Sequence, residues 1–322
     1  MNTVILKDLS IGYTAKGNEK VVASGLNATI NSGELTCLLG QNGIGKSTLL
    51  RTLAAFQPPL AGDVLLNIDP PLSPPRGSDL KPPLGEVWKG FRPLSSLNSS
   101  FLSRMIGVVL TEKLAIKNMT AEELIAMGRA PYTGFWGRLT EEDHQVVSDA
   151  IRLVGIESLA GRMIQTLSDG ERQKVMIAKA LAQQTPIIYL DEPTAFLDYP
   201  SKVEMMQLLR RLAVQEQKTI FLSTHDVELS LQVADCIWLM ETPTKPPQGE
   251  VTPSKPPQGE ALGHSPLGGD EGGLLSLGET EGGLYVGTPR QLADQGVLSR
   301  FIEREGITFD RSSLTLRVTP IG

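Results

Sequence analysis

Long apolar runs are missing from this sequence. The chain has 322 residues, and none of its apolar stretches approaches the ~20 residues that a membrane-spanning helix needs. Its first residues, MNTVILKDLSIGY, lack the basic lead and the long apolar segment of a secretory signal. We therefore expect a cytosolic protein.

Cysteine is also scarce, with two in the whole chain. Both lie in apolar runs that are typical of strands, Cys37 in LTCLLG and Cys236 in CIWLM. Small, weakly polar thiols in such runs are usually buried, so we expect both to be core residues. Neither a disulfide framework nor a metal-ligand spacing is present.

An excess of positive charge is absent as well. The formal net charge is −6, and the isoelectric point is about 5.3. Proteins that bind nucleic acid usually carry a strongly basic face, so this balance argues against a nucleic-acid partner. With 40% hydrophobic and 20% charged residues, the composition indicates a soluble globular protein with a substantial core.

Two stretches rich in proline and glycine interrupt the globular pattern. The first contains DPPLSPPRGSDLKPPLGE, and the second begins with the near-identical repeats TPTKPPQGE and TPSKPPQGE. Such segments bury too little apolar surface to offset the entropy lost on ordering, so we predict flexible insertions at about 69–89 and 243–283. The KPPQGE repeats are either inert or a docking site for a partner. The rest of the chain, residues 1–322 without these insertions, is long enough for a single domain.

Apolar runs and helical patterns alternate along the remaining sequence. The expected strands are LTCLLG, IGVVL, IIYLDE, TIFLSTH and CIWLM. Between them, Thr120 and Glu123 form a capping-box pattern. A second helix is indicated by the spacing of Val146, Val147, Ala150, Ile151 and Val154. This alternation predicts an α/β fold with a mainly parallel sheet covered on both faces, and ligands bind such sheets at the carboxyl ends of the strands.

The stretch GQNGIGKS matches the phosphate-binding pattern G-x-x-x-x-G-K-[ST] at every fixed position, between a strand and a helical TLLRTLAAF. Its glycines let backbone N–H groups converge on phosphate oxygens. Lys46 can reach the β- and γ-phosphates, and the Ser47 hydroxyl can ligate Mg²⁺. The expected nucleotide-binding residues of this loop are Gly40, Gln41, Asn42, Gly43, Ile44, Gly45, Lys46, Ser47 and Thr48.

Acidic residues and a histidine follow two other strands. Asp191 and Glu192 end IIYLDE, where Asp191 is suited to the Mg²⁺ shell and Glu192 to polarising a water that attacks the γ-phosphate. His225 ends TIFLSTH and is expected to contact the γ-phosphate. Upstream of the loop, Tyr13 in LSIGY is either a packed surface tyrosine or an aromatic that stacks on the nucleotide base.

A second exposed helix N-terminus is predicted at LSDGERQ, residues 167–173. Together with the phosphate loop, YLDEPTAFLD and STHD, in this order, it resembles the ATP-binding cassette (ABC) family over essentially the whole chain outside the insertions. The resemblance implies a P-loop NTPase core, an N-terminal antiparallel β subdomain and a helical signature subdomain at about 112–166. It also implies ATP and Mg²⁺ as ligands, with Glu192, His225 and Lys46 as catalytic residues.

In that family two cassettes pack head to tail, and the LSGGQ-type motif of one copy closes over the ATP held by the other. By this resemblance Ser168, Gly170 and the helix N-terminus that follows bind the γ-phosphate across the interface. Asp198, in AFLD, matches the interface loop that joins the two sites. The resemblance therefore implies a second copy of the chain as a partner.

The stretch AMGRAPYTGFWGRLTEED is similar to the G-R-x-P-[YH] segment of importers for iron–siderophore, haem and cobalamin. This likeness implies an ATPase subunit of an importer at the cytoplasmic face of the cell membrane. Its partners would be two membrane permease subunits and, indirectly, a periplasmic or lipoprotein substrate-binding protein. The alternatives are a soluble ATPase of the iron–sulfur assembly type, an exporter subunit, or a regulatory nucleotide-binding module without turnover.

The sequence departs from the family pattern at three places. The signature carries two extra acids, Asp169 and Glu171, which weaken the attraction for phosphate unless they point away. Where the family has a glutamine that ligates Mg²⁺, Thr111 follows IGVVL, and either its hydroxyl or the Glu112 carboxylate is the candidate replacement. The repeat segment lies in a turn that is normally short, where an insertion costs little stability.

Overall fold

A computed structural model of the chain describes residues 2–15, 18–68, 90–110, 118–134, 136–241 and 283–319. The predicted insertions at 69–89 and 243–283 lie outside the described residues, apart from Gly283. Thr111 and Glu112 also lie outside them. The structure therefore does not bear on the predictions made for these positions.

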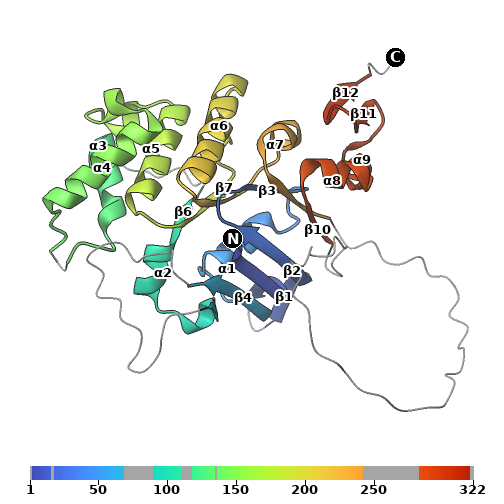
Figure 1. Cartoon of the computed structure of the whole chain (residues 1–322), viewed down its shortest axis with the longest axis horizontal. Coiled ribbons are helices and arrows are strands. Elements are labelled where there is room, and N and C mark those ends of the chain that lie inside the picture. The colour runs from blue at the N-terminus through green and yellow to red at the C-terminus, as the bar shows by residue number, and fades with distance from the viewer. Residues whose placement is uncertain are drawn as a thin grey trace, which may run out of the picture.

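A six-stranded sheet forms the centre of the molecule, in the order β10-β9-β3-β8-β7-β6 (Figure 1). Five of these strands run parallel, and β10 pairs with β9 in the antiparallel sense. The five predicted strands are confirmed, and LYVG forms the sixth strand, β10. Their bounds are β3 Leu35–Gly40, β6 Ile106–Val109, β7 Ile187–Asp191, β8 Thr219–Ser223, β9 Cys236–Met240 and β10 Leu284–Gly287.

The N-terminal part of the chain forms a separate antiparallel sheet, in the order β2-β1-β4-β5. Its strands are β1 Asn2–Ala15, β2 Asn18–Asn31, β4 Ala61–Asn67 and β5 Phe91–Pro93. Helix α1 (Lys46–Leu53) packs between the two sheets, because its apolar residues share one core cluster with Val4 of β1 and Trp238 of β9. The predicted antiparallel subdomain is thus confirmed.

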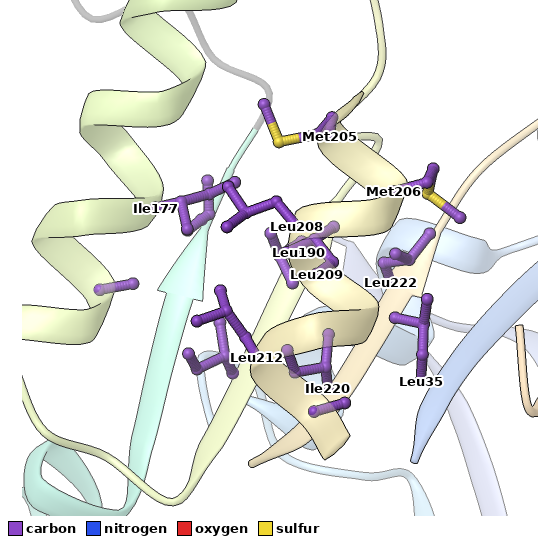
Figure 2. Close-up of a cluster of buried hydrophobic side chains, with 14 of the residues drawn as sticks. Leu35, Ile177, Leu190, Met205, Met206, Leu208, Leu209, Leu212, Ile220 and Leu222 are labelled. Atoms are coloured by element: carbon purple, nitrogen blue, oxygen red, sulfur yellow. The ribbon is translucent and has the colours of Figure 1, made fainter. Parts of the chain in front are cut away.

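The opposite face of the central sheet is covered by α5 (Asp169–Ala182), α6 (Tyr199–Gln215) and α7 (Val227–Val233). In Figure 2, Leu209 and Leu212 of α6 point toward Leu190, Ile220 and Leu222 of the sheet. The strands are apolar on both faces, because these helices cover one face and α1 with the antiparallel sheet covers the other. This arrangement leaves the carboxyl ends of the strands, where the polar residues lie, as the accessible edge.

A helical subdomain flanks the sheet at the β6 edge (Figure 1). It contains α3 (Ala121–Ala126), α4 (Glu141–Val154) and the N-terminal approach to α5. The predicted capping box of Thr120 and Glu123 is confirmed, with both reciprocal hydrogen bonds present. Of the predicted apolar face of α4, Val147, Ala150, Ile151 and Val154 are buried, and Val146 is partly buried.

The remaining α-helices and strands lie toward the edge strands β6 and β10 of the central sheet. They are α2 (Ser99–Met105), which precedes β6, and the C-terminal α8 (Pro289–Asp294), α9 (Val297–Ile302), β11 (Ile307–Asp310) and β12 (Thr315–Val318). Among the described helices, none has the length and apolar character to cross a membrane.

Both cysteines are free thiols. Cys37 is fully buried as predicted, whereas Cys236, at the first position of β9, is only partly buried. Burial raises the pKa of each thiol to about 12, so neither is a reactive thiolate near neutral pH.

Candidate functional site

The loop from Gly40 to Gly45 joins β3 to α1 and folds back on itself through a hydrogen bond from the Ile44 N–H to the Gln41 carbonyl oxygen (3.3 Å). Gly45 has a φ of 114°, and a Cβ at this position would collide with Cγ1 of Val22. Only glycine meets both the conformational and the steric demand. The loop therefore packs directly against Val22 of β2 at Gly45.

Lys46 is the first residue of α1, and its side chain is buried beneath this loop, with 6% of the residue exposed. Its Nζ donates hydrogen bonds to the carbonyl oxygens of Gly40 (2.7 Å) and Gln41 (3.3 Å). Burial lowers the pKa of Lys46, and the nearby carboxylates of Glu192 and Asp191 partly oppose this effect. The lysine ammonium is thus directed into the loop and toward the acidic pair.

Asp191, at the end of β7, faces the start of α1. Its Oδ1 accepts a hydrogen bond from the Ser47 hydroxyl (3.2 Å) and another from the Ser223 hydroxyl (2.6 Å). Ser223 is fully buried and lies beside Asp191 in the register of β7 and β8. Sequence reasoning missed Ser223, and the only signal was its place at the end of a strand adjacent to the acids.

Glu192 follows Asp191 with a φ of 45°, a left-handed conformation that a non-glycine residue rarely adopts. Its N–H is held by the carbonyl oxygen (3.1 Å) and the hydroxyl oxygen (3.0 Å) of Ser223. Its Oε2 lies 3.2 Å from Nδ1 of His225. Backbone strain of this kind persists only where surrounding contacts hold it, as the two hydrogen bonds to Ser223 do here.

Tyr13 lies on β1 directly opposite Lys20 of β2. The residue is 46% exposed, and the Nζ of Lys20 lies 5.5 Å from its ring centroid. Because β2 also contacts Gly45 through Val22, this exposed ring stands on the strand pair that borders the loop. Its stacking on a nucleotide base stays a prediction.

The predicted second phosphate site lies at the N-terminus of α5. Ser168 is the N-cap: its hydroxyl accepts the Glu171 N–H (3.2 Å), and its own N–H donates to Oε2 of Glu171 (2.8 Å). These hydrogen bonds with Ser168 lower the pKa of the Glu171 carboxyl. Glu171 is therefore an ionised carboxylate built into the helix cap.

Both extra acids of this segment are paired with arginines. Asp169 lies 2.8 Å from Arg172 on the next turn, and Glu171 lies 3.0 Å from Arg162. Each carboxylate is thus matched by a guanidinium of the same chain. The sequence left open whether the two acids point away from a bound phosphate. In the structure each acid forms an ion pair that offsets its negative charge.

Gly170 lies beside the start of α6, because a Cβ on Gly170 would be 3.7 Å from Cδ2 of Leu197 and 3.9 Å from Oγ of Ser201. Asp198 is the N-cap of α6, and its side chain accepts the Ser201 N–H (3.1 Å). The structure thus gathers the predicted residues into two clusters. The first contains the loop from Gly40 to Thr48 with Asp191, Glu192 and His225, and the second contains Ser168, Gly170 and Asp198.

The GRAPY stretch, residues 128–132, connects helices of the helical subdomain to one another. Arg129 is buried, donates to Asp143 of α4 (2.8 Å) and also donates to the carbonyl oxygen of Ala182 at the end of α5 (2.8 Å). The Tyr132 hydroxyl donates to the Gln183 carbonyl oxygen (2.9 Å), and the Arg129 guanidinium lies 4.1 Å from the Tyr132 ring centroid. These side chains join α4 to α5.

A protein-family profile described as ABC transporter matches residues 23–195, which include the loop, the signature segment and both acids. An uncharacterised ABC transporter ATP-binding protein of Methanocaldococcus jannaschii is 40% identical over 73% of this chain and 72% of its own length. The iron(3+)-hydroxamate import ATP-binding protein of Bacillus subtilis is 33% identical over 70% of this chain and 74% of its own length. The ferric enterobactin transport ATP-binding protein of Escherichia coli is 32% identical over 71% of this chain and 74% of its own length.

Solved structures agree with these matches. A chain of an inward-facing ABC transporter described as of the metal-chelate type has a TM-score of 0.56 and 26% identity, covering 74% of this chain and 79% of its own length. A dimeric ATP-binding cassette in a post-hydrolysis state, bound to ADP and phosphate, has a TM-score of 0.57 and 26% identity, covering 73% and 93%.

Proposed function

The chain belongs to the ABC transporter family, and from that premise we propose that it is the ATP-hydrolysing subunit of an importer for iron–siderophore-type substrates. The observation that supports hydrolysis is the Glu192–His225 pair, which lies beside Asp191 and the buried Lys46 at the carboxyl edge of the sheet. We assign residues 1–322 to one ATPase domain, with the helical subdomain at about 112–166.

The loop from Gly40 to Thr48 holds the phosphates of ATP through its N–H groups and the ammonium of Lys46. The Ser47 hydroxyl and the Asp191 carboxylate, 3.2 Å apart, suit Mg²⁺, which prefers oxygen donors and usually shares its coordination with substrate phosphates. That ion, when bound, neutralises charge on the β- and γ-phosphates. Ser223 keeps the Asp191 carboxylate turned toward Ser47.

Glu192 is the proposed general base. It accepts a proton from a water whose oxygen attacks the γ-phosphorus, and the bond from that phosphorus to the bridging oxygen of ADP breaks. His225, 3.2 Å from Glu192, orients the carboxylate and donates to the γ-phosphate. The hydrogen bonds from the Glu192 N–H to Ser223 maintain the left-handed φ of Glu192. A fixed backbone at this residue is consistent with a base that must be held in one position.

The second cluster serves the nucleotide of a partner copy. The N-terminus of α5 carries roughly half a unit of positive charge, and Ser168 and Gly170 expose it to an incoming γ-phosphate. The pairing of Asp169 with Arg172 and of Glu171 with Arg162 limits the repulsion that two bare carboxylates would cause. A homodimeric, head-to-tail sandwich follows, with Asp198 at the interface.

The transport role is supported by relatives whose names specify the import of iron(3+)-hydroxamate and the transport of ferric enterobactin. These names favour an importer over the exporter and iron–sulfur assembly alternatives. We propose two membrane permease subunits as direct partners, a substrate-binding protein as an indirect one, and the cytoplasmic face of the cell membrane as the location. Cobalamin and haem belong to the wider substrate class that the GRAPY stretch suggests.

The test is co-expression with permease subunits of an iron–siderophore importer, followed by purification and reconstitution in vesicles. We expect the chain to co-purify with the permease and its ATPase activity to rise when the ferric chelate and its binding protein are added. Hydrolysis without association would contradict the importer role and leave the ATPase intact. Binding of ATP without phosphate release, even in the assembled complex, would support the regulatory module instead.

A further inference from the structure

Asp226, the residue after His225, joins two other segments of the chain. Its Oδ2 accepts a hydrogen bond from the Thr194 hydroxyl (2.9 Å), and its Oδ1 lies 2.9 Å from Nζ of Lys202 on α6. Thr194 is buried, and the side chains of Lys202 and Asp226 are 20% and 22% exposed. Both carboxylate oxygens are therefore satisfied in a largely enclosed network, where such bonds are stronger than at a free surface.

Thr194 connects this network to Glu192. The chain turns directly after β7, and the turn is closed by a hydrogen bond from the Ala195 N–H to the Glu192 carbonyl oxygen (3.0 Å). Thr194 lies inside that turn, so its bond to Asp226 restrains the backbone that carries Glu192 at its left-handed φ. Displacing Thr194 would shift the Glu192 carboxylate.

Asp226 also holds the backbone of His225. On one side, the Thr224 N–H donates to the Leu38 carbonyl oxygen on β3 (3.1 Å). On the other, the Asp226 N–H donates to the Thr224 hydroxyl (3.1 Å), and the Asp226 carbonyl oxygen accepts the Ser230 hydroxyl (2.8 Å). The His225 side chain is half exposed, so the position of its ring depends mainly on this fixed backbone.

Lys202 extends the network to the loop before α6. It lies in the first turns of that helix, whose N-cap is Asp198. The Leu197 N–H donates to the Thr194 carbonyl oxygen (3.3 Å), so Thr194 and Lys202 hold the 195–198 loop from its two ends. The Asp226 carboxylate thus contacts the supports of Glu192 and Asp198, and the Asp226 backbone holds that of His225.

We propose that Asp226 is a positioning residue, which keeps the Glu192–His225 pair aligned and couples it to the 195–198 loop through Thr194 and Lys202. The proposal rests on the roles proposed above for Glu192 and His225. Misplacement of a catalytic group by about 1 Å can cost on the order of 10²-fold in rate, so loss of this network should lower turnover. Nucleotide affinity should hold, because the phosphate loop makes none of the contacts of the network described here.

The experiment compares Asp226→Asn and Thr194→Val with the parental full-length chain. We expect kcat to fall by about 10-fold or more in Asp226→Asn and Thr194→Val, with the KM for ATP changed by less than about two-fold. The matched control is Arg210→Met, which removes another cation–carboxylate pair of α6, 3.2 Å from Asp235. This control should retain parental kcat.

Two further measurements separate positioning from mere folding. The number of ATP molecules bound per chain and the melting temperature are recorded for each variant, and Thr194→Ser, which keeps the hydroxyl, should recover most of the turnover lost in Thr194→Val. Losses of kcat that match losses of binding stoichiometry would overturn the proposal, since a structural role alone would then suffice. Unchanged kcat in Asp226→Asn and Thr194→Val would overturn it as well.

Glu192→Gln in the same assay distinguishes this proposal from the function it rests on. If Glu192→Gln stalls hydrolysis while Asp226→Asn turns over at the parental rate, only the positioning role of Asp226 is wrong. If Glu192→Gln itself turns over at the parental rate, the assignment of the base is wrong, and the positioning role is wrong with it.

Discussion

The hydroxyl of Ser47 donates a 3.2 Å hydrogen bond to Oδ1 of Asp191, a residue 144 positions later in the chain. Ser47 lies in the first turn of α1 and Asp191 ends β7, and these two elements are in contact. The pairing gives two oxygen donors at one point beside the phosphate loop. This is the donor chemistry that a hard divalent cation requires.

Ser47→Ala should raise the Mg²⁺ concentration needed for half-maximal ATP hydrolysis by about 10-fold or more, because one oxygen donor is lost. The measurement is ATPase rate against free Mg²⁺ at saturating ATP. Ser96→Ala, which removes an exposed hydroxyl bonded to the Pro93 carbonyl oxygen, is the control and should leave the curve unchanged. An unshifted curve for Ser47→Ala would rule out the hydroxyl as a ligand.

Lys46→Ala should weaken ATP binding by roughly 10–100-fold, since hydrogen bonds to charged groups contribute about 1.5–3 kcal/mol each. Equilibrium binding of a fluorescent ATP analogue measures this effect directly. Lys7→Ala removes an exposed lysine of β1 and serves as the control. Parental affinity in Lys46→Ala would mean that the phosphate loop has been misassigned.

Glu192→Gln should lower the rate of phosphate release by about 10²–10³-fold while preserving ATP binding. The amide cannot accept the proton of the attacking water, so ATP stays intact and the dimer should accumulate. Size-exclusion chromatography with and without ATP reports the dimer, and Glu216→Gln, an exposed residue after α6, is the control. Monomeric Glu192→Gln in saturating ATP would argue against the sandwich arrangement.

The charge balance at the second cluster predicts a compensating pair of substitutions. Arg172→Ala leaves the Asp169 carboxylate without its 2.8 Å partner and should weaken ATP-driven dimerisation in the Glu192→Gln background. Adding Asp169→Gly should restore dimerisation, because it removes the uncompensated charge. Dissociation constants from analytical ultracentrifugation test the cycle, and equal weakening in the single and double variants would contradict it.

Arg129→Met should destabilise the fold by about 3–5 kcal/mol, the usual cost of leaving one charge of a buried pair without its partner. Arg129 and Asp143 have 5% and 7% of their side chains exposed and lie 2.8 Å apart. Denaturant unfolding at neutral pH measures the difference. Arg138→Met, at an exposed position before α4, is the control and should unfold like the parental chain.

The same pair makes stability depend on acidity. Burial alone would raise the pKa of the Asp143 carboxyl, but hydrogen bonds from the Thr140 N–H, Arg129 and the Thr140 hydroxyl together hold it below its ordinary value of 3.8. Because the pKa is lower in the folded state, the ionised carboxylate stabilises the fold fully above the unfolded-state pKa. This contribution is lost as the pH falls through the folded-state pKa. The parental free energy of unfolding should therefore fall on acidification below about pH 4, and Arg129→Met should flatten this fall.

Local patterns in the sequence were enough to predict the strands, the phosphate loop and the capping box of Thr120 and Glu123. Each is determined by residues close together in the chain: a glycine where the loop needs φ of 114°, or a threonine three positions before a glutamate. The burial of Cys236 was overestimated, because its place at the first position of β9 leaves it partly exposed.

The tertiary structure alone decided which side chains support Glu192 and His225. Ser223 reaches the acids across 31 and 32 positions, and Asp226 reaches Thr194 across 32 and Lys202 across 24. These contacts depend on the parallel register of β7 and β8 and on the packing of α6 against the sheet, which no short stretch of sequence encodes. The sequence by itself therefore determined which residues are candidates for the chemistry, and the packed sheet and helices decided how those residues are held.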